Sequence, residues 1–95
     1  MKAAVGLLTV ELFISDALTL KDRRRVVNSL LERLANRHNV SVADLGPDNR
    51  PHDATVAVSA VANDPRHVAR VLQAALGLIE SEPRAVCRHS ELTIL

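Results

Sequence analysis

Strict alternation at residues 4–14 is the feature that most limits what this chain can fold into. Every second residue from Ala4 to Ile14 is apolar or glycine, while Thr9 and Glu11 fall on the other face. A period of two is the pattern of a β-strand that buries one face. Because Glu11 interrupts the apolar run and no cleavage signal follows, we interpret the segment as a strand and not as a secretory leader.

A helix is predicted directly after this strand. Thr19 followed three residues later by Asp22 resembles a capping box, in which the two side chains accept hydrogen bonds from each other's backbone N–H groups. The helix is expected to continue to about His38. Its apolar residues recur at helical spacing and form one stripe toward the core, namely Leu20, Val27, Leu30, Leu31 and Leu34.

Three further strands are predicted from short alternating segments. The first covers residues 39–45 and leads into a turn rich in Gly, Pro, Asp and Asn at 46–51. The next covers residues 54–62, with Val56 and Val58 facing inward. The last covers residues 85–95. Its two faces differ little in polarity near Arg88, which indicates a bulge or an edge position.

A second helix is expected between the last two strands. Asp64 suits the N-cap because its side chain accepts hydrogen bonds from free N–H groups, and Pro65 suits the first helical position. Pro83 stops the helix. The predicted buried stripe consists of Val68, Val71, Leu72, Ala75, Leu76 and Ile79.

The resulting order is strand, helix, strand, strand, helix, strand. Right-handed crossovers then favour a ferredoxin-like α+β sandwich, with a four-stranded antiparallel sheet and two helices on one face. At 95 residues the chain has room for one such domain over residues 1–95. We also expect the first and third strands to be adjacent and parallel, so that both helices begin at the same edge of the domain.

Composition narrows the classes of function. The net charge is +1, so no overall field imposes nucleic-acid or membrane binding, and only local clusters of charge argue for either. No stretch approaches the ~20 apolar residues of a membrane helix. The single cysteine, Cys87, cannot form an internal disulfide, so we expect a soluble protein of the reducing cytoplasm.

Four cations crowd the first turns of the first predicted helix. The helix dipole disfavours cations there by a few tenths of a kcal/mol each. With both helices beginning at one edge, this cluster and the start of the second helix would form an anion-binding edge for an RNA backbone. The alternative is a solvated basic helix end, partly neutralised by Asp22 and Asp64. The candidate residues are Lys21, Arg23, Arg24, Arg25, Arg66 and His67.

The sheet face opposite the helices is a second candidate surface. It is small and moderately apolar, which suits contact with another subunit or protein, although such a face is also compatible with simple solvation. The candidate interface residues are Val5, Leu7, Ala57 and Val61.

Catalytic, metal and cofactor sites are not predicted. Cys87 and His89 share one strand face, but two ligands are too few for a closed zinc site, and Cys87 is interpreted as a half-buried strand residue. No Walker loop, Gly-rich dinucleotide motif or nucleophile elbow occurs, and His52 and Asp53 form a loop pair without a positioned nucleophile. We therefore expect no enzymatic activity, no metal and no nucleotide cofactor.

Two segments resemble the YlxP-like family of small bacterial proteins of unknown function. Residues 19–34, T-L-K-D-R-R-R-V-V-N-S-L-L-E-R-L, with N-V-S-V-A-D at 39–44, are similar to the family pattern S-L-K-E-K-R-R-V-V-K-S-L-L-x-R-L followed by N-V-S-V-A-E. The segment V-S-A-V-A-N-D at 58–64, with the valines and leucine that follow His67, is similar to A-V-V-S-N-D-x-x-H-V-x-x-V-L. The resemblance covers nearly the whole chain.

The resemblance implies a ferredoxin-like fold. Because such genes often lie among translation-initiation and ribosome-maturation genes, it also implies a role around RNA or the ribosome. One segment departs from the family: residues 47–54 replace a stretch near D-L-W-Q-R-A. Our leading hypothesis is a non-enzymatic accessory protein that docks on RNA or a ribosomal particle, and the alternative is a protein-interaction module that dimerises through the open sheet face.

Overall fold

The computed structural model describes residues 2–95. Six elements follow one another in the predicted order: β1 (Ala4–Ile14), α1 (Leu20–Arg37), β2 (Ser41–Gly46), β3 (Asp53–Ala62), α2 (Pro65–Glu80) and β4 (Ala85–Ile94). Their bounds lie within two residues of those expected from the alternation and helical spacing, except that α2 ends at Glu80, where Ser81 caps it before Pro83.

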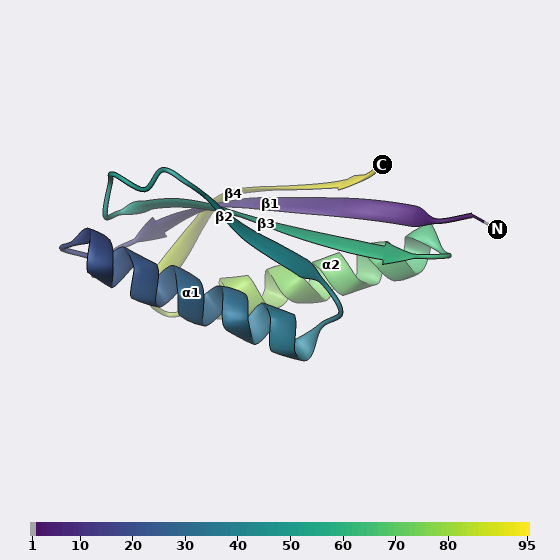
Figure 1. The fold of residues 1–95 in the computed structure, drawn as a ribbon, viewed down its shortest axis with the longest axis horizontal. Coiled ribbons are helices and arrows are strands. Elements are labelled where there is room, and N and C mark those ends of the chain that lie inside the picture. Colours follow the sequence, from purple (N-terminus) through teal and green to yellow (C-terminus); the bar gives the residue numbers. More distant parts are fainter. Residues whose placement is uncertain (1) are drawn as a thin grey trace.

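The four strands form one antiparallel sheet in the order β2-β3-β1-β4 (Figure 1). Both helices lie along the same side of this sheet (Figure 1). The fold is therefore the predicted ferredoxin-like α+β sandwich, whose other sheet face is open. No helix of residues 2–95 is long and apolar enough to cross a membrane.

The expected parallel pairing of the first and third strands is wrong. β1 and β3 are neighbours but antiparallel, with Ala4 opposite Ala62 and Phe13 opposite Asp53. The α1 crossover returns the chain so that β2 runs in the direction of β1, and the β2–β3 hairpin then reverses it. The two helices consequently begin at opposite ends of the molecule, as the colour gradient along α1 and α2 shows (Figure 1).

The core lies between the inner sheet face and the two helices. α2 buries four of its predicted stripe residues fully and the other two partly, so its periodicity is confirmed. The start of α1 differs from the expectation: Leu20 is 36% exposed, whereas Arg23 and Val26 are buried. The fully buried strand residues that meet the helices are Leu8, Val10, Ile14, Val56 and Val58.

Gly6 allows α2 to approach β1 closely. A Cβ atom at this position would lie 2.5 Å from Val68 Cγ1 and 2.7 Å from Leu72 Cδ1, well inside van der Waals contact. Both of those side chains are buried and have no free space to move into. The glycine is therefore required by packing at this one point of the sheet.

A bulge interrupts the pairing of β1 with β4. Glu11 pairs with His89 and Leu12 with Cys87, so Arg88 is the extra residue on β4. β4 is also an edge strand. The poor alternation near Arg88 thus has both of the causes considered for it, and the bulge directs the Arg88 guanidinium onto the ring of Phe13, 4.4 Å from the ring centroid.

Candidate functional site

The first turn of α1 is held by the predicted capping box. The Asp22 backbone N–H donates to Thr19 Oγ1 at 3.1 Å, and the Thr19 backbone N–H donates to Asp22 Oδ2 at 3.1 Å. A further bond from the Leu18 N–H to the same carboxylate lowers the pKa of Asp22. The capping box therefore fixes where the helix begins, and with it the backbone positions that carry the cations.

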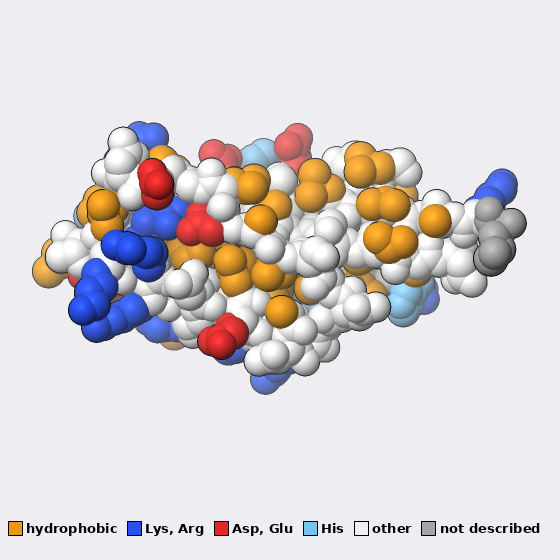
Figure 2. All heavy atoms as spheres, in the orientation of Figure 1, with side chains coloured by type: hydrophobic (Ala, Val, Ile, Leu, Met, Phe, Trp, Pro, Cys, Tyr) orange, Lys and Arg blue, Asp and Glu red, His pale blue; other side chains and the backbone are white. Residues whose placement is uncertain are grey.

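Three of the predicted cations lie exposed on this helix start. Lys21, Arg24 and Arg25 are all open to solvent. Within residues 2–95 none of the three forms an ion pair with a carboxylate, although six other ion pairs are present. Figure 2 shows Lys and Arg side chains gathered at the end of the molecule where α1 begins, with a few acidic side chains among them.

Arg23 does not belong to this exposed group, and its assignment as an anion-binding residue is wrong. Its side chain is 2% exposed. The guanidinium donates two hydrogen bonds to the Asp44 carboxylate, at 2.8 and 2.9 Å, and a third from Nε to the backbone oxygen of Asp53 at 2.7 Å. These bonds lower the pKa of Asp44. Arg23 thus fastens α1 to the β2–β3 hairpin, and each of its three guanidinium nitrogens already donates a hydrogen bond within the fold.

Arg66 and His67 do not converge with the α1 cluster. They begin α2, which starts beside the first residues of β1, whereas α1 starts beyond the last ones. About nine residues of β1 separate the two ends, roughly 30 Å at the rise of a strand. Arg66 also lies beside the N-cap carboxylate of its own helix, with Nε 3.5 Å from Asp64 Oδ1. The proposed site shared by the two helix starts therefore does not exist.

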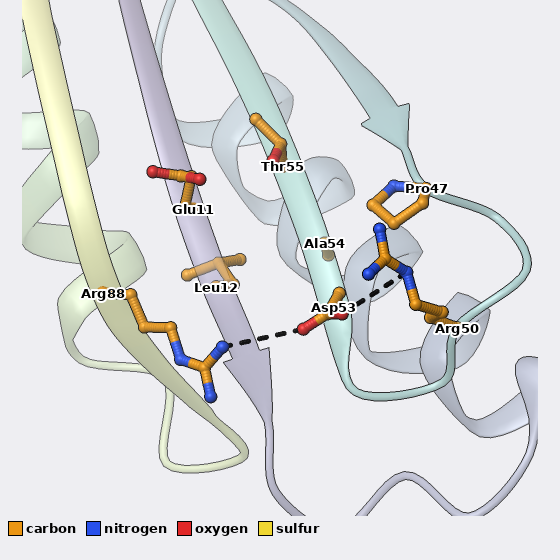
Figure 3. A pocket seen from close by; sticks show the side chains of 8 residues that line it. All are labelled: Glu11, Leu12, Pro47, Arg50, Asp53, Ala54, Thr55 and Arg88. Atoms are coloured by element: carbon orange, nitrogen blue, oxygen red, sulfur yellow. Dashed lines mark ion pairs between the residues drawn. The ribbon is translucent and has the colours of Figure 1, made fainter.

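The structure instead brings two other arginines to the end where α1 begins. Arg50 comes from the β2–β3 hairpin and Arg88 from the β4 bulge, and they approach Asp53 from either side, at 3.6 and 3.7 Å (Figure 3). Sequence reasoning missed both. The weak alternation near Arg88 was the only signal for it, and nothing in the local sequence placed Arg50.

These arginines line a hollow of about 260 Å³ on the open side of the sheet (Figure 3). Glu11 and Asp53 supply two carboxylates to the same hollow, so its formal charges balance. Phe13 adjoins it and is covered by other side chains: the Arg88 guanidinium lies over its ring and the ring of His52 stacks on it at 5.3 Å. Phe13, which is the only Phe, Tyr or Trp of the chain, is thus engaged in internal contacts.

Cys87 lies half-buried on β4, as predicted. Burial raises the pKa of its thiol, so the thiolate that would bind a metal or act as a nucleophile is disfavoured near neutral pH. Within residues 2–95 no group of three or more His, Cys, Asp or Glu side chains is placed to hold a metal ion.

Comparison with known proteins places these features in a family. The model of a family described as protein of unknown function, DUF503, matches residues 5–91. The chain belongs to this family. The matched range includes the start of α1, the hairpin and the open sheet face, so the surfaces described above lie within the DUF503 domain.

The proteins that resemble the chain include a bacterial relative and a solved structure. One is the uncharacterized protein YlxP of Bacillus subtilis, 30% identical over 79 residues, which are 83% of this chain and 86% of that protein. The other is a solved structure, the de novo designed protein Foldit4, with a TM-score of 0.58 and 16% identity, covering 99% of this chain and 97% of that one. The DUF503 and YlxP matches confirm the family resemblance, and the designed protein supports the fold alone.

Proposed function

We propose that this DUF503 protein is a non-enzymatic accessory protein that binds the phosphate backbone of RNA through the basic end. We define the basic end as the exposed cations Lys21, Arg24 and Arg25 on α1 together with Arg50 on the hairpin. The observation that carries the proposal is that the three α1 cations are exposed and unpaired within residues 2–95.

Such a cluster is unfavourable for the isolated domain. Each cation opposes the positive end of the helix dipole, and Lys21 and Arg25 form a like-charge pair one helical turn apart, at a cost of a few tenths of a kcal/mol each. A polyanion removes this cost, because phosphate oxygens accept hydrogen bonds from the guanidinium groups and neutralise their charge. RNA fits better than a small anion, since the cations are spread over an exposed surface. Only Arg24 among them lines the nearby hollow of about 240 Å³, where Asp48 supplies a carboxylate that disfavours an anion.

Recognition through bases is not part of this proposal. RNA-binding sheets and single-strand platforms stack bases on exposed aromatic rings, and Phe13 is engaged with His52 and Arg88. Binding is therefore electrostatic and largely independent of sequence. If the three α1 cations neutralise three phosphates, the affinity for single-stranded RNA falls with salt at a log–log slope of about −2.

The test compares two double variants with equal change of charge. Arg24→Glu with Arg25→Glu reverses the basic end, and Arg66→Glu with Arg70→Glu reverses two exposed arginines at the opposite end of the molecule. Binding to ribosomal RNA and to ribosomal subunits is measured at two salt concentrations. Because roughly 30 Å separates the two pairs and the Debye length is about 8 Å at physiological salt, the second pair has little effect on a contact at the basic end.

We expect the first variant to bind at least about 10-fold more weakly at physiological salt and to show a shallower salt dependence, while the second retains binding within about 3-fold at that salt. Equal losses in both folded variants would mean that net charge alone matters. No binding by the wild type at low salt would refute the proposal.

A further inference from the structure

The sheet face opposite the helices has no covering layer among residues 2–95 (Figure 1). Side chains in neighbouring strands form rows across this open face. One row pairs Val5 with Val61, and the next pairs Leu7 with Ser59 on β3, which in turn pairs with Ser41 on β2. Leu7 is 36% exposed and Val61 61% exposed. Figure 2 shows hydrophobic side chains gathered over the part of the sheet farthest from the start of α1.

The relief of this face is uneven. The β1 residues Val5 and Leu7 are large, whereas the β3 and β2 residues beside Leu7 are alanines and serines. A hollow of about 110 Å³ lies over these small residues, next to the Leu7 side chain. The hollow is lined by Leu7, Ser41, Val42, Ala43, Ala57 and Ser59. A ridge on β1 thus lies beside a depression over β3 and β2.

We infer that a second copy of this chain covers the open face, related by a two-fold axis that runs along the strands between β1 and β3. This axis lays β1 of each copy over β3 of the other, at the same level along the strands. Leu7 of one copy then enters the depression over Ser59 of its partner, and the reciprocal contact forms by symmetry. The ridge lies on β1 and the depression lies over the adjacent β3. A two-fold axis between these two strands therefore places the ridge of each copy over the depression of the other.

The charged end of the face also fits this arrangement. Asp53 on β3 and Arg88 at the β4 bulge lie at the same end of the sheet, on either side of β1. The two-fold axis brings Asp53 of one copy over β1 of the other, next to the strand that carries Arg88. Their distance of 3.7 Å within one chain is long for an ion pair, so the guanidinium has capacity for a second carboxylate.

The available area is consistent with a weak dimer. A face of four strands, each at most ten or eleven residues long, has a footprint of roughly 600 Å², so two copies bury on the order of 1,200 Å² in total. This is the lower limit of stable interfaces. Because leucine and valine supply the contact without exposed aromatic anchors, we expect a dissociation constant in roughly the micromolar range or weaker.

Sedimentation velocity over roughly 1 µM to 1 mM tests the dimer. The wild type should shift with concentration from a mass of 10.3 kDa toward twice that value. Leu7→Glu and Val61→Glu should each remain monomeric throughout, with wild-type far-UV circular dichroism. Leu18→Glu is the matched control, because Leu18 is 83% exposed and lies in the loop before α1, outside the open face. It should dimerise like the wild type.

A mixing experiment tests the pairing of Leu7 with Ser59. Ser59→Lys alone should be monomeric, because it would bury two lysines against leucine. An equimolar mixture with Leu7→Glu should form a heterodimer, since the glutamate of one chain faces the lysine of the other and the reciprocal contact is native. A mixture that stays monomeric would overturn the two-fold arrangement.

Two other outcomes would overturn the inference. One is a wild type that remains monomeric to about 1 mM. The other is a dimer that survives both Leu7→Glu and Val61→Glu, which would place the contact on an edge strand. The inference does not depend on the RNA proposal, because Leu7 and Val61 lie outside the basic end. Leu7→Glu should therefore keep its salt-sensitive binding to short RNA.

Discussion

Replacing Arg23 by methionine is expected to destabilise the fold by about 3 kcal/mol. The change keeps most of the side-chain volume but removes all three hydrogen bonds, two to the Asp44 carboxylate and one to the Asp53 backbone oxygen. Removing one partner of a buried ion pair costs about 3–5 kcal/mol. The lower end applies here, because the Asp44 side chain is 27% exposed and water can hydrate it once the guanidinium is gone.

Urea unfolding followed by far-UV circular dichroism measures this loss. With a slope of about 1–3 kcal/mol/M for a small domain, the midpoint should fall by roughly 1–3 M. Arg24→Met is the matched control, since Arg24 is exposed and makes only a long bond of 3.5 Å from Nε to the Leu20 oxygen. It should stay within about 0.5 kcal/mol of the wild type.

The contribution should also depend on pH in a defined direction. Arg23 lowers the pKa of Asp44, so the folded state holds the carboxylate ionised more tightly than the unfolded state does. The stability it supplies is present above the ordinary aspartate pKa of about 3.9 and is lost as the pH falls through the lowered folded value. The difference between wild type and Arg23→Met should shrink below about pH 4. Equal stability of the Arg23 and Arg24 variants at pH 7 would refute this reasoning.

Two further stability predictions follow from local geometry. Gly6→Ala should destabilise the fold by about 1–3 kcal/mol, because the added Cβ would clash with Val68 and Leu72. Gly77→Ala should stabilise it by about 0.5–1 kcal/mol, because Gly77 is an exposed helical residue with open space around it. Thermal unfolding compares the two variants, and a shift of the melting temperature in the same direction for both would contradict the packing argument. Glu82 accepts hydrogen bonds from Arg84 and Arg33, and its pKa is lowered to about 2, so its contribution is present above about pH 4.5 and is lost as the pH falls toward 2. Glu82→Gln should therefore show a flatter loss of stability than the wild type over this acid range, and parallel curves would show that Glu82 is uncoupled from folding.

The two proposed surfaces serve different contacts. The basic end lies on α1 and the hairpin, and the apolar part of the open face lies on β1, β3 and β2 at a distance from it. A dimer built on the open face would carry two basic ends. RNA binding by such a dimer gains avidity only where both basic ends reach the same RNA molecule. Because the Leu7→Glu variant should be monomeric, it should bind long RNA more weakly than the wild type. Its affinity for short RNA should be unchanged.

The sequence by itself determined the secondary structure, the fold class and the family. Strand alternation and helical spacing record which side of each element meets the core, and these patterns are local, so residues 4–14 and the stripe of α2 were predicted correctly. The capping box at Thr19 and Asp22 is equally local, because both partners lie within one helical turn. The same helical projection places Lys21 and Arg25 in solvent, where they lie, but it places Arg24 beside the apolar stripe together with Arg23, and only the structure shows that Arg24 is exposed.

Tertiary structure alone decided how the charged residues group. A period of two reads the same in both directions along a strand, but the predicted antiparallel sheet already requires neighbouring β1 and β3 to run in opposite directions. The expected convergence of Arg66 with Arg24 assumed a parallel pair instead, and it failed. Arg23 lies at the border of the apolar stripe, and whether such a residue is exposed or buried depends on partners that are distant in sequence. Asp44 and the Asp53 oxygen, 21 and 30 residues away, supply those partners and make its burial favourable.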